Sequence, residues 1–161
     1  MEGFRSILLP VPEAEALVDP LRRAGDPWRE RGVPAHMTIA GPWPLEVELP
    51  RDELAGLARE LRGTRFELAT AGMLGDALCL FPAEDAALLA WRERVLRAVG
   101  VPDRLDDGWR LHLTVRRYEA APAEVGEGAS ALERSLPIAC TVGDLLIAEM
   151  DASGRVGLRP L

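Results

Sequence analysis

Two copies of one short motif constrain this chain more than any other feature of its sequence. Its only two histidines, His36 and His112, both begin the pattern His-x-Thr-aliphatic, as HMTI at 36–39 and HLTV at 112–115. At average residue frequencies, roughly one histidine in a hundred has that context by chance, and both histidines about one time in ten thousand. The repetition therefore indicates a shared role for the two segments.

The elements around the motifs recur as well. Leu9 precedes His36 by 27 residues, and Phe81 precedes His112 by 31 residues. The first unit is predicted as a strand over 6–11, helical segments over 13–18 and 19–23, a polar loop over 25–35 and the motif strand 36–40. The second is predicted as a strand over 77–81, a helix over 84–99, a polar loop over 101–108 and the motif strand 109–118. We therefore expect an α+β protein in which two similar halves pair about a pseudo-twofold axis, with a mixed or antiparallel sheet and helices outside.

Chain length and helix signals refine this prediction. The 161 residues suit a single domain, 1–161, whose two lobes each supply one motif. Asp19 followed by Pro20 is typical of a helix start, with a capping residue before a first-turn proline. We therefore expect the helix that follows the first strand to end near Val18 and a new helix to begin there.

Strand geometry explains the spacing within the motif. Side chains alternate across a strand, so the histidine and the threonine project from one face while the aliphatic residues point to the other. Two such strands on one cleft bring together His36, Thr38, His112 and Thr114. This set of groups suits the hydrolysis of a phosphodiester. One neutral imidazole can take a proton from water while the other, protonated, gives one to the departing sugar oxygen. The hydroxyls and an arginine can hold the non-bridging oxygens of the phosphate. Because histidine titrates near pH ~6.5, one charged and one neutral copy can coexist near neutrality.

Composition limits the partners of the chain. Its net charge is −7 and all 19 basic residues are arginines, so it has no general basic surface for a long nucleic-acid duplex. Without lysine, a bound phosphate has to be held by arginines, hydroxyls or backbone N–H groups. No apolar run approaches the roughly 20 residues of a membrane helix. Cys79 and Cys140 lie in apolar runs, which predicts reduced, buried thiols. We therefore expect a cytoplasmic protein; we also expect a monomer that binds no membrane.

With these motifs the chain resembles the two-histidine (2H) phosphoesterase superfamily, which includes 2′-5′ RNA ligase-like proteins and 2′,3′-cyclic nucleotide phosphodiesterases. The flanking segments LLPVPEAEALVDPLRR and RGVPAHMTIAGPW are also similar to the bacterial 2′-5′ RNA ligase-like branch. The resemblance covers nearly the whole chain. It implies two lobes of duplicated β-α-β-α-β units, mostly antiparallel sheets that form a barrel-like core, and a central cleft.

The same resemblance implies an activity. It implies hydrolysis of cyclic phosphodiesters without a metal or a cofactor, on a nucleotide or an RNA-end phosphate. In this chain His36 and His112 would form the acid–base pair, and Thr38 and Thr114 would bind the phosphate.

An arginine shortly after the second motif is a further expected phosphate contact. Strand alternation places Arg116 on the face of His112 and Thr114, whereas the family pattern favours Arg117. A β-bulge would reconcile the two assignments. We keep both arginines as candidates, with Arg116 first on geometry.

Aromatic residues near the motifs are candidates for contacts with a base. Trp43 follows the first motif and Tyr118 lies on the predicted face of His112, so both are assigned to substrate binding. Trp28, in the preceding loop, can close over a ligand. Trp91 and Trp109 are assigned to the core, and for the other three a structural role is also open.

A purely structural role and a metal site are the competing hypotheses for the histidines. A single histidine on a half-buried strand is usually structural, but the duplicated context argues against that for the pair. A metal site is disfavoured because neither histidine has an acidic residue two places on and no HExxH segment is present. The main alternative to an enzyme is a module that binds nucleotides or RNA ends in the same cleft without turnover.

Overall fold

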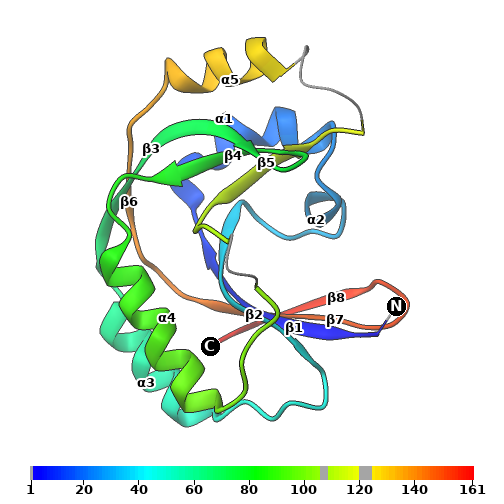
Figure 1. The fold of residues 1–161 in the computed structure, drawn as a ribbon, viewed down its shortest axis with the longest axis vertical. Coiled ribbons are helices and arrows are strands. Elements are labelled where there is room, and N and C mark those ends of the chain that lie inside the picture. The colour runs from blue at the N-terminus through cyan, green and yellow to red at the C-terminus, as the bar shows by residue number, and fades with distance from the viewer. Residues whose placement is uncertain (1, 106–108, 120–124) are drawn as a thin grey trace.

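In the computed structural model, residues 2–105, 109–119 and 125–161 are described. Within these ranges the strands form one antiparallel sheet of eight, in the order β6-β3-β4-β5-β2-β1-β7-β8, with helices around it (Figure 1). The elements are β1 (Phe4–Pro10), α1 (Pro12–Arg23), α2 (Pro27–Glu30), β2 (His36–Pro44), α3 (Arg51–Leu61), β3 (Arg65–Leu74), β4 (Ala77–Pro82), α4 (Ala86–Val99), β5 (Leu113–Arg117), α5 (Val125–Glu133), β6 (Ile138–Thr141), β7 (Leu146–Met150) and β8 (Val156–Pro160).

The sheet consists of two similar halves. One half is β2-β1-β7-β8 and the other is β5-β4-β3-β6, so the two motif strands lie innermost and pair with each other. The expected α+β fold of two duplicated units is confirmed. Across the described residues the row of strands ends at β6 and β8, and the sheet is therefore open rather than closed into a barrel.

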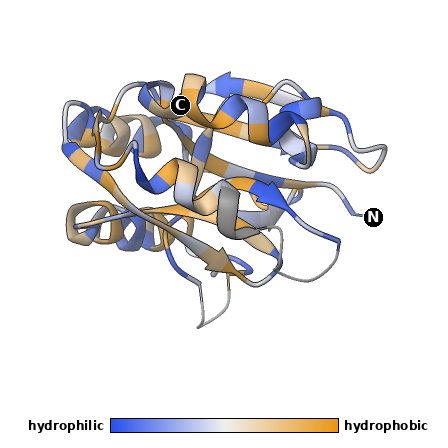
Figure 2. Cartoon of the chain, turned by 90° about the horizontal axis from the view of Figure 1, so that it is seen from above, coloured by the Kyte–Doolittle hydropathy of each residue, from blue (hydrophilic) through white to orange (hydrophobic). Residues whose placement is uncertain are grey.

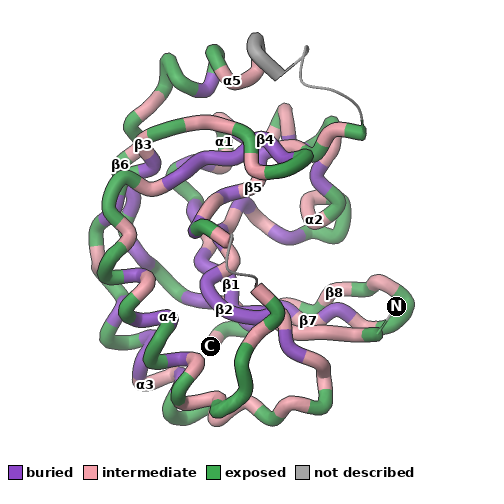
Figure 3. The backbone as a smooth tube through the Cα atoms, in the orientation of Figure 1, coloured by how far each residue is buried: buried purple, intermediate pink, exposed green. Residues whose placement is uncertain are grey.

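The crossover helices are exchanged between the halves. Helix α1 connects β1 to β2 but packs on β5 and β6, while α4 connects β4 to β5 but packs on β2 and α3 (Figure 1). The helices carry both apolar and polar residues (Figure 2), and their apolar sides cover the sheet. Burial is concentrated in β1, β2 and β4, whereas β8 is largely accessible (Figure 3). Each crossover helix therefore packs on the motif strand of the other half, α1 on β5 and α4 on β2.

The helix prediction at Asp19 and Pro20 was wrong. Helix α1 runs unbroken from Pro12 to Arg23 with Pro20 inside it. Proline removes one helical hydrogen bond, whose acceptor here is the carbonyl of Ala16. Because Ala16 and Pro20 are both exposed, water can solvate that carbonyl, and the buried stripe of α1 holds the helix against β5 and β6.

Smaller differences concern loops and element ends. Helix α2 lies inside the predicted loop 25–35, where the carboxylate of Asp26 accepts a hydrogen bond from the N–H of Trp28 at 3.0 Å. Strand β5 begins at Leu113, so His112 lies just before its first paired residue. Residues 106–108 of the predicted loop 101–108 lie outside the described residues.

Other predictions concern the thiols and the membrane. Cys79 and Cys140 are both free and buried, as expected. None of the helices in the described ranges is long and apolar enough to cross a bilayer.

Candidate active site

The pairing of β2 with β5 decides where the two motifs lie. Met37 is directly opposite Leu113, and both side chains are fully buried in the main core beneath the helices. Directly opposed residues of antiparallel strands share a face, and their neighbours along each strand point to the other face. That other face carries His36, Thr38, His112 and Thr114. The structure therefore brings the four predicted motif residues together on the side of the sheet away from the main core, which we call the motif face.

Both imidazoles are oriented in the same way. Nδ1 of His36 lies 2.8 Å from the carbonyl oxygen of Pro34, and Nδ1 of His112 lies 2.6 Å from that of Arg110. A carbonyl only accepts, so Nδ1 carries the proton in each neutral ring and Nε2 carries the lone pair. The two halves thus present equivalent tautomers.

The surroundings of both rings favour the neutral form. Burial, together with the smaller effects of the nearby charges of Arg22 and His112, lowers the pKa of His36 to about 4. Burial also lowers the pKa of His112, with the positive charges of Arg117 and Arg110 adding to the effect. In the ligand-free protein both rings are therefore mainly neutral at pH 7, which differs from the expected pair of one charged and one neutral ring. A bound phosphate anion would favour protonation of one of them.

Aromatic side chains adjoin His36. The ring of Trp28 lies 6.0 Å from that of His36 at 80°, and Phe4 lies 6.0 Å from Trp28 at 74°, both edge-on. Trp28 also packs on the buried Leu8 and Val33. The loop tryptophan that was expected near a ligand is thus beside the first motif.

A bulge in β5 decides which arginine joins the motif face. Thr114 lies opposite Cys79 while Arg116 lies opposite Leu78, so the intervening Val115 has no counterpart on β4. An extra residue of this kind breaks the alternation, and the residues beyond it change faces. Arg116 therefore shares the face of Leu78, which belongs to the main core.

Arg117 is the arginine on the motif face. It lies opposite Ala77, which clusters with Cys79 on that face. Its charge reaches His112, whose pKa it lowers, and its Nη1 lies 2.7 Å from Oδ1 of Asp76. The bulge expected as one possibility from the sequence is present, and it favours Arg117.

The preference for Arg116 and the placement of Tyr118 were wrong. The guanidinium of Arg116 stacks on the ring of Tyr118 at 4.7 Å. The Cγ of Arg116 lies only 3.0 Å from the position that a Cβ on Gly25 would take, at the end of α1. Tyr118 packs against the main core. Both side chains lie on the helix side of the sheet because the bulge reverses the alternation after Val115.

The assignment of Trp43 to substrate binding was also wrong. Its side chain is fully buried in the main core, and its indole N–H donates to the carbonyl of Val101 at 3.0 Å. The first motif strand continues to Pro44, and Trp43 lies on the side that the helices cover. Proximity in sequence to the motif did not indicate proximity to the motif face.

Arg110 is a site residue that was not predicted from the sequence. Its guanidinium lies over the ring of Phe81 at 4.3 Å, and its charge lowers the pKa of His112. The signal was available, because Arg110 precedes His112 by two residues and alternation places both on one face. Two arginines, Arg110 and Arg117, therefore place positive charge near His112.

A cavity of about 840 Å³ lies away from both histidines. It is formed by β3, β6 and the start of α4, with Phe66, Ala87 and Cys140 among its lining residues. The candidate site is instead the motif face, which combines two imidazoles, two hydroxyls and two arginines.

Comparisons with known proteins agree with this architecture. E. coli LigT in complex with ATP has a TM-score of 0.57 at 18% identity, covering 100% of this chain and 96% of LigT. A protein described as a phosphoesterase has a TM-score of 0.58 at 18% identity, covering 98% and 95%. TT0787 of Thermus thermophilus has a TM-score of 0.52 at 23% identity, covering 100% and 95%. At these identities the likeness shows the fold.

Sequence comparison reaches further. No curated protein matches the chain significantly. The model of one family, described as the 2′-5′ RNA ligase superfamily, matches residues 10–154, which is most of the chain. The chain therefore belongs to the 2′-5′ RNA ligase superfamily.

Proposed function

We propose that this protein hydrolyses cyclic phosphodiesters of the 2′,3′-cyclic nucleotide or RNA-end type, with His36 and His112 as its acid–base pair. One observation carries the proposal. The Met37–Leu113 pairing puts two imidazoles of the same tautomer, with their threonines, on one face of the sheet. A protein that only binds nucleotides, which is the alternative, has no need of two proton-transfer groups.

The chemistry needs two balanced proton transfers. Nε2 of one neutral histidine accepts a proton from water, and the water oxygen forms a bond to phosphorus. The other histidine, protonated once the phosphate is bound, gives its proton to the departing sugar oxygen as the bond between phosphorus and that oxygen breaks. The product is a phosphomonoester, and solvent exchange restores both rings. With a ribose 5′-hydroxyl in place of water, the same attack would form a bond from that oxygen to phosphorus and break the bond to the 3′ oxygen, which is a 2′-5′ ligation.

The remaining groups on the motif face bind the phosphate. The hydroxyls of Thr38 and Thr114 and the guanidinium groups of Arg110 and Arg117 can donate to its non-bridging oxygens, where charge grows in the transition state. Both proton transfers are assigned to imidazoles, so the proposed reaction needs neither a metal nor a cofactor.

The ligands of similar structures support a nucleotide substrate. E. coli LigT has been solved with ATP, with NADP+ and with 3′-AMP. A small nucleotide or an RNA end also suits a chain with a net charge of −7 better than a long duplex does. We further propose that the protein acts as a single-domain monomer in the cytoplasm.

A panel of 2′,3′-cyclic nucleotides, assayed with and without EDTA, tests the proposal. We expect turnover that EDTA does not change and a bell-shaped pH profile of kcat/KM. The base must be neutral and the acid protonated, and both histidine pKa values lie below the ordinary 6.5. Activity should therefore fall as pH rises through the higher pKa, which places the optimum below pH ~6.5. Tight nucleotide binding without turnover across the panel would favour the binding module.

The bulge in β5 leads to a comparison of neighbouring arginines. Arg117→Ala should lower kcat/KM about 10–100-fold, because a hydrogen bond to a charged group contributes about 1.5–3 kcal/mol. Arg116→Met should leave kcat/KM near the parent value, because Arg116 lies on the helix side over Tyr118. Steady-state kinetics of both variants, with melting curves to confirm folding, measure the difference. Equal losses, or a larger loss for Arg116→Met, would show that the bulge does not select the phosphate contact.

A further inference from the structure

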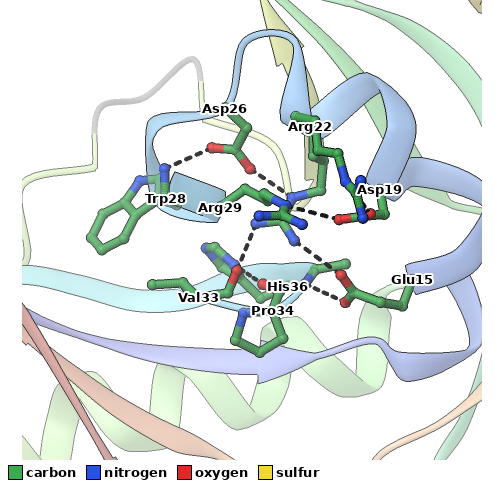
Figure 4. A network of polar contacts seen from close by, with 11 residues as sticks. Glu15, Asp19, Arg22, Asp26, Trp28, Arg29, Val33, Pro34 and His36 are labelled. Atoms are coloured by element: carbon green, nitrogen blue, oxygen red, sulfur yellow. Dashed lines mark hydrogen bonds and ion pairs between the residues drawn. The ribbon is translucent and has the colours of Figure 1, made fainter. Parts of the chain in front are cut away.

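A buried arginine of α1, Arg22, lies close to His36 (Figure 4). The side chain of Arg22 is only 1% exposed. Its Nε donates to Oδ2 of Asp26 at 2.7 Å and its Nη2 to the carbonyl of Val33 at 2.9 Å, while its Nη1 lies 3.4 Å from Oε1 of Glu15. One guanidinium thus joins α1, the cap of α2 and the segment that leads into β2.

Glu15 acts on the next peptide of that segment. Its Oε2 accepts a hydrogen bond from the N–H of Ala35 at 2.7 Å. This N–H belongs to the same peptide group as the carbonyl of Pro34, to which Nδ1 of His36 donates at 2.8 Å. A peptide group is planar, so holding its N–H also sets the direction of its carbonyl. Glu15 and His36 therefore bind opposite ends of one rigid unit.

The contacts of Arg22 and Glu15 thus fix both peptide groups around Pro34. Arg22 holds the carbonyl before Pro34, and Glu15 holds the N–H after it. The ion pair between the two side chains aligns the carboxylate for this bond. The carbonyl of Pro34 faces His36. Because a carbonyl only accepts, it selects the tautomer of His36 with the proton on Nδ1.

We propose that Glu15 and Arg22 are positioning residues that set the tautomer of His36 and direct its Nε2 lone pair toward the motif face. The hydrogen-bond geometry of the free protein carries this assignment. Its consequence for catalysis rests on the proposed function, because only an acid–base role for His36 makes the tautomer matter to the rate.

The chain offers a matched control for Glu15. Glu13 lies on the same helix, and its Oε1 likewise accepts a backbone N–H, that of Thr141, at 3.0 Å. His112 is an internal control, because it makes the same Nδ1 bond to the carbonyl of Arg110. In the described part of the chain, the contacts of Glu15 and Arg22 do not include His112.

The experiment is nitrogen NMR of the two histidines in the free protein at pH 7, where both rings are mainly neutral. In the parent protein both should show a protonated Nδ1. Glu15→Ala should shift His36 toward a mixture of tautomers and leave His112 unchanged. Glu15→Gln keeps an oxygen acceptor for the N–H of Ala35 and should restore most of the parent signal. Glu13→Ala should leave both rings as they are.

Kinetics give the second measurement. In Glu15→Ala, kcat should fall on the order of 10-fold with little change in KM, because the base or acid is misplaced while phosphate binding remains. The side chain of Glu15 is 38% exposed, so this variant should fold. Arg22→Met, compared with Arg23→Met on the exposed face of α1, should move the His36 signal in the same direction.

The outcomes separate the two proposals. An unchanged His36 tautomer in Glu15→Ala would overturn the positioning role, whatever happens to the rate. An altered tautomer in a protein whose parent form hydrolyses no cyclic phosphate would uphold the positioning role and contradict the proposed function.

Discussion

Replacing either His36 or His112 with alanine should lower kcat on a 2′,3′-cyclic nucleotide by about 10²–10⁴-fold, the usual contribution of a general acid or base. In the proposed reaction each ring supplies one of the two proton transfers. The kcat of the double variant should be only slightly below that of the less active single variant, because the two residues act as a unit. Single-turnover kinetics at saturating substrate measure the effect on the chemical step.

Binding of the product provides the control for this prediction. Calorimetry with a 2′- or 3′-nucleotide should show affinities within a few-fold of the parent protein, because the hydroxyls and arginines of the motif face remain. A histidine variant that turns over at the parent rate would exclude that residue from the acid–base pair. A variant that loses binding and rate together would assign the imidazole to phosphate binding instead.

Trp43→Ala should lower the free energy of unfolding by about 3–5 kcal/mol, as expected for truncating a fully buried tryptophan. The variant loses the packing of the indole in the main core and its hydrogen bond to the carbonyl of Val101. Trp43→Phe keeps much of the apolar volume and should lose less. Denaturant unfolding followed by circular dichroism measures the change, with an unchanged slope showing that the transition remains comparable.

The same position also tests whether the side chain of Trp43 contacts the substrate. Per folded molecule, Trp43→Phe should keep the parent KM, because the side chain does not reach the motif face. Met73→Ala is the exposed control for the stability measurement. Because the side chain of Met73 is exposed, this variant should change the free energy of unfolding by at most about 0.5 kcal/mol. A raised KM for Trp43→Phe with unchanged stability would return Trp43 to the substrate site.

Much of the fold could be predicted from the motif repeat and from local periodicity. The two units, their order of elements and the opposite faces of histidine and Met37 all follow from strand alternation, and the structure confirms them. The core assignment of Trp91 is also confirmed, since its helical stripe is buried and its indole N–H donates to the carbonyl of Leu57 at 2.8 Å. These features depend on residues close together in sequence.

The errors share one physical origin. Pro20 continues a helix because packing and solvation of α1 override a local start signal. Arg116 and Tyr118 were placed by alternation across Val115, where β5 bulges against β4. Trp43 was placed by its distance along the chain from the motif. In each case a contact with another element decides the outcome, and no local pattern reports it.

The sequence by itself determined which histidines and threonines form the candidate site and how each motif divides between two faces, because the two-residue period is a property of any extended strand. Only the tertiary structure decided that Met37 pairs with Leu113, that the bulge brings Arg117 to the motif face, and that Glu15 reaches the peptide holding His36. These depend on register and side-chain reach between distant segments, which are set when the two halves pack together.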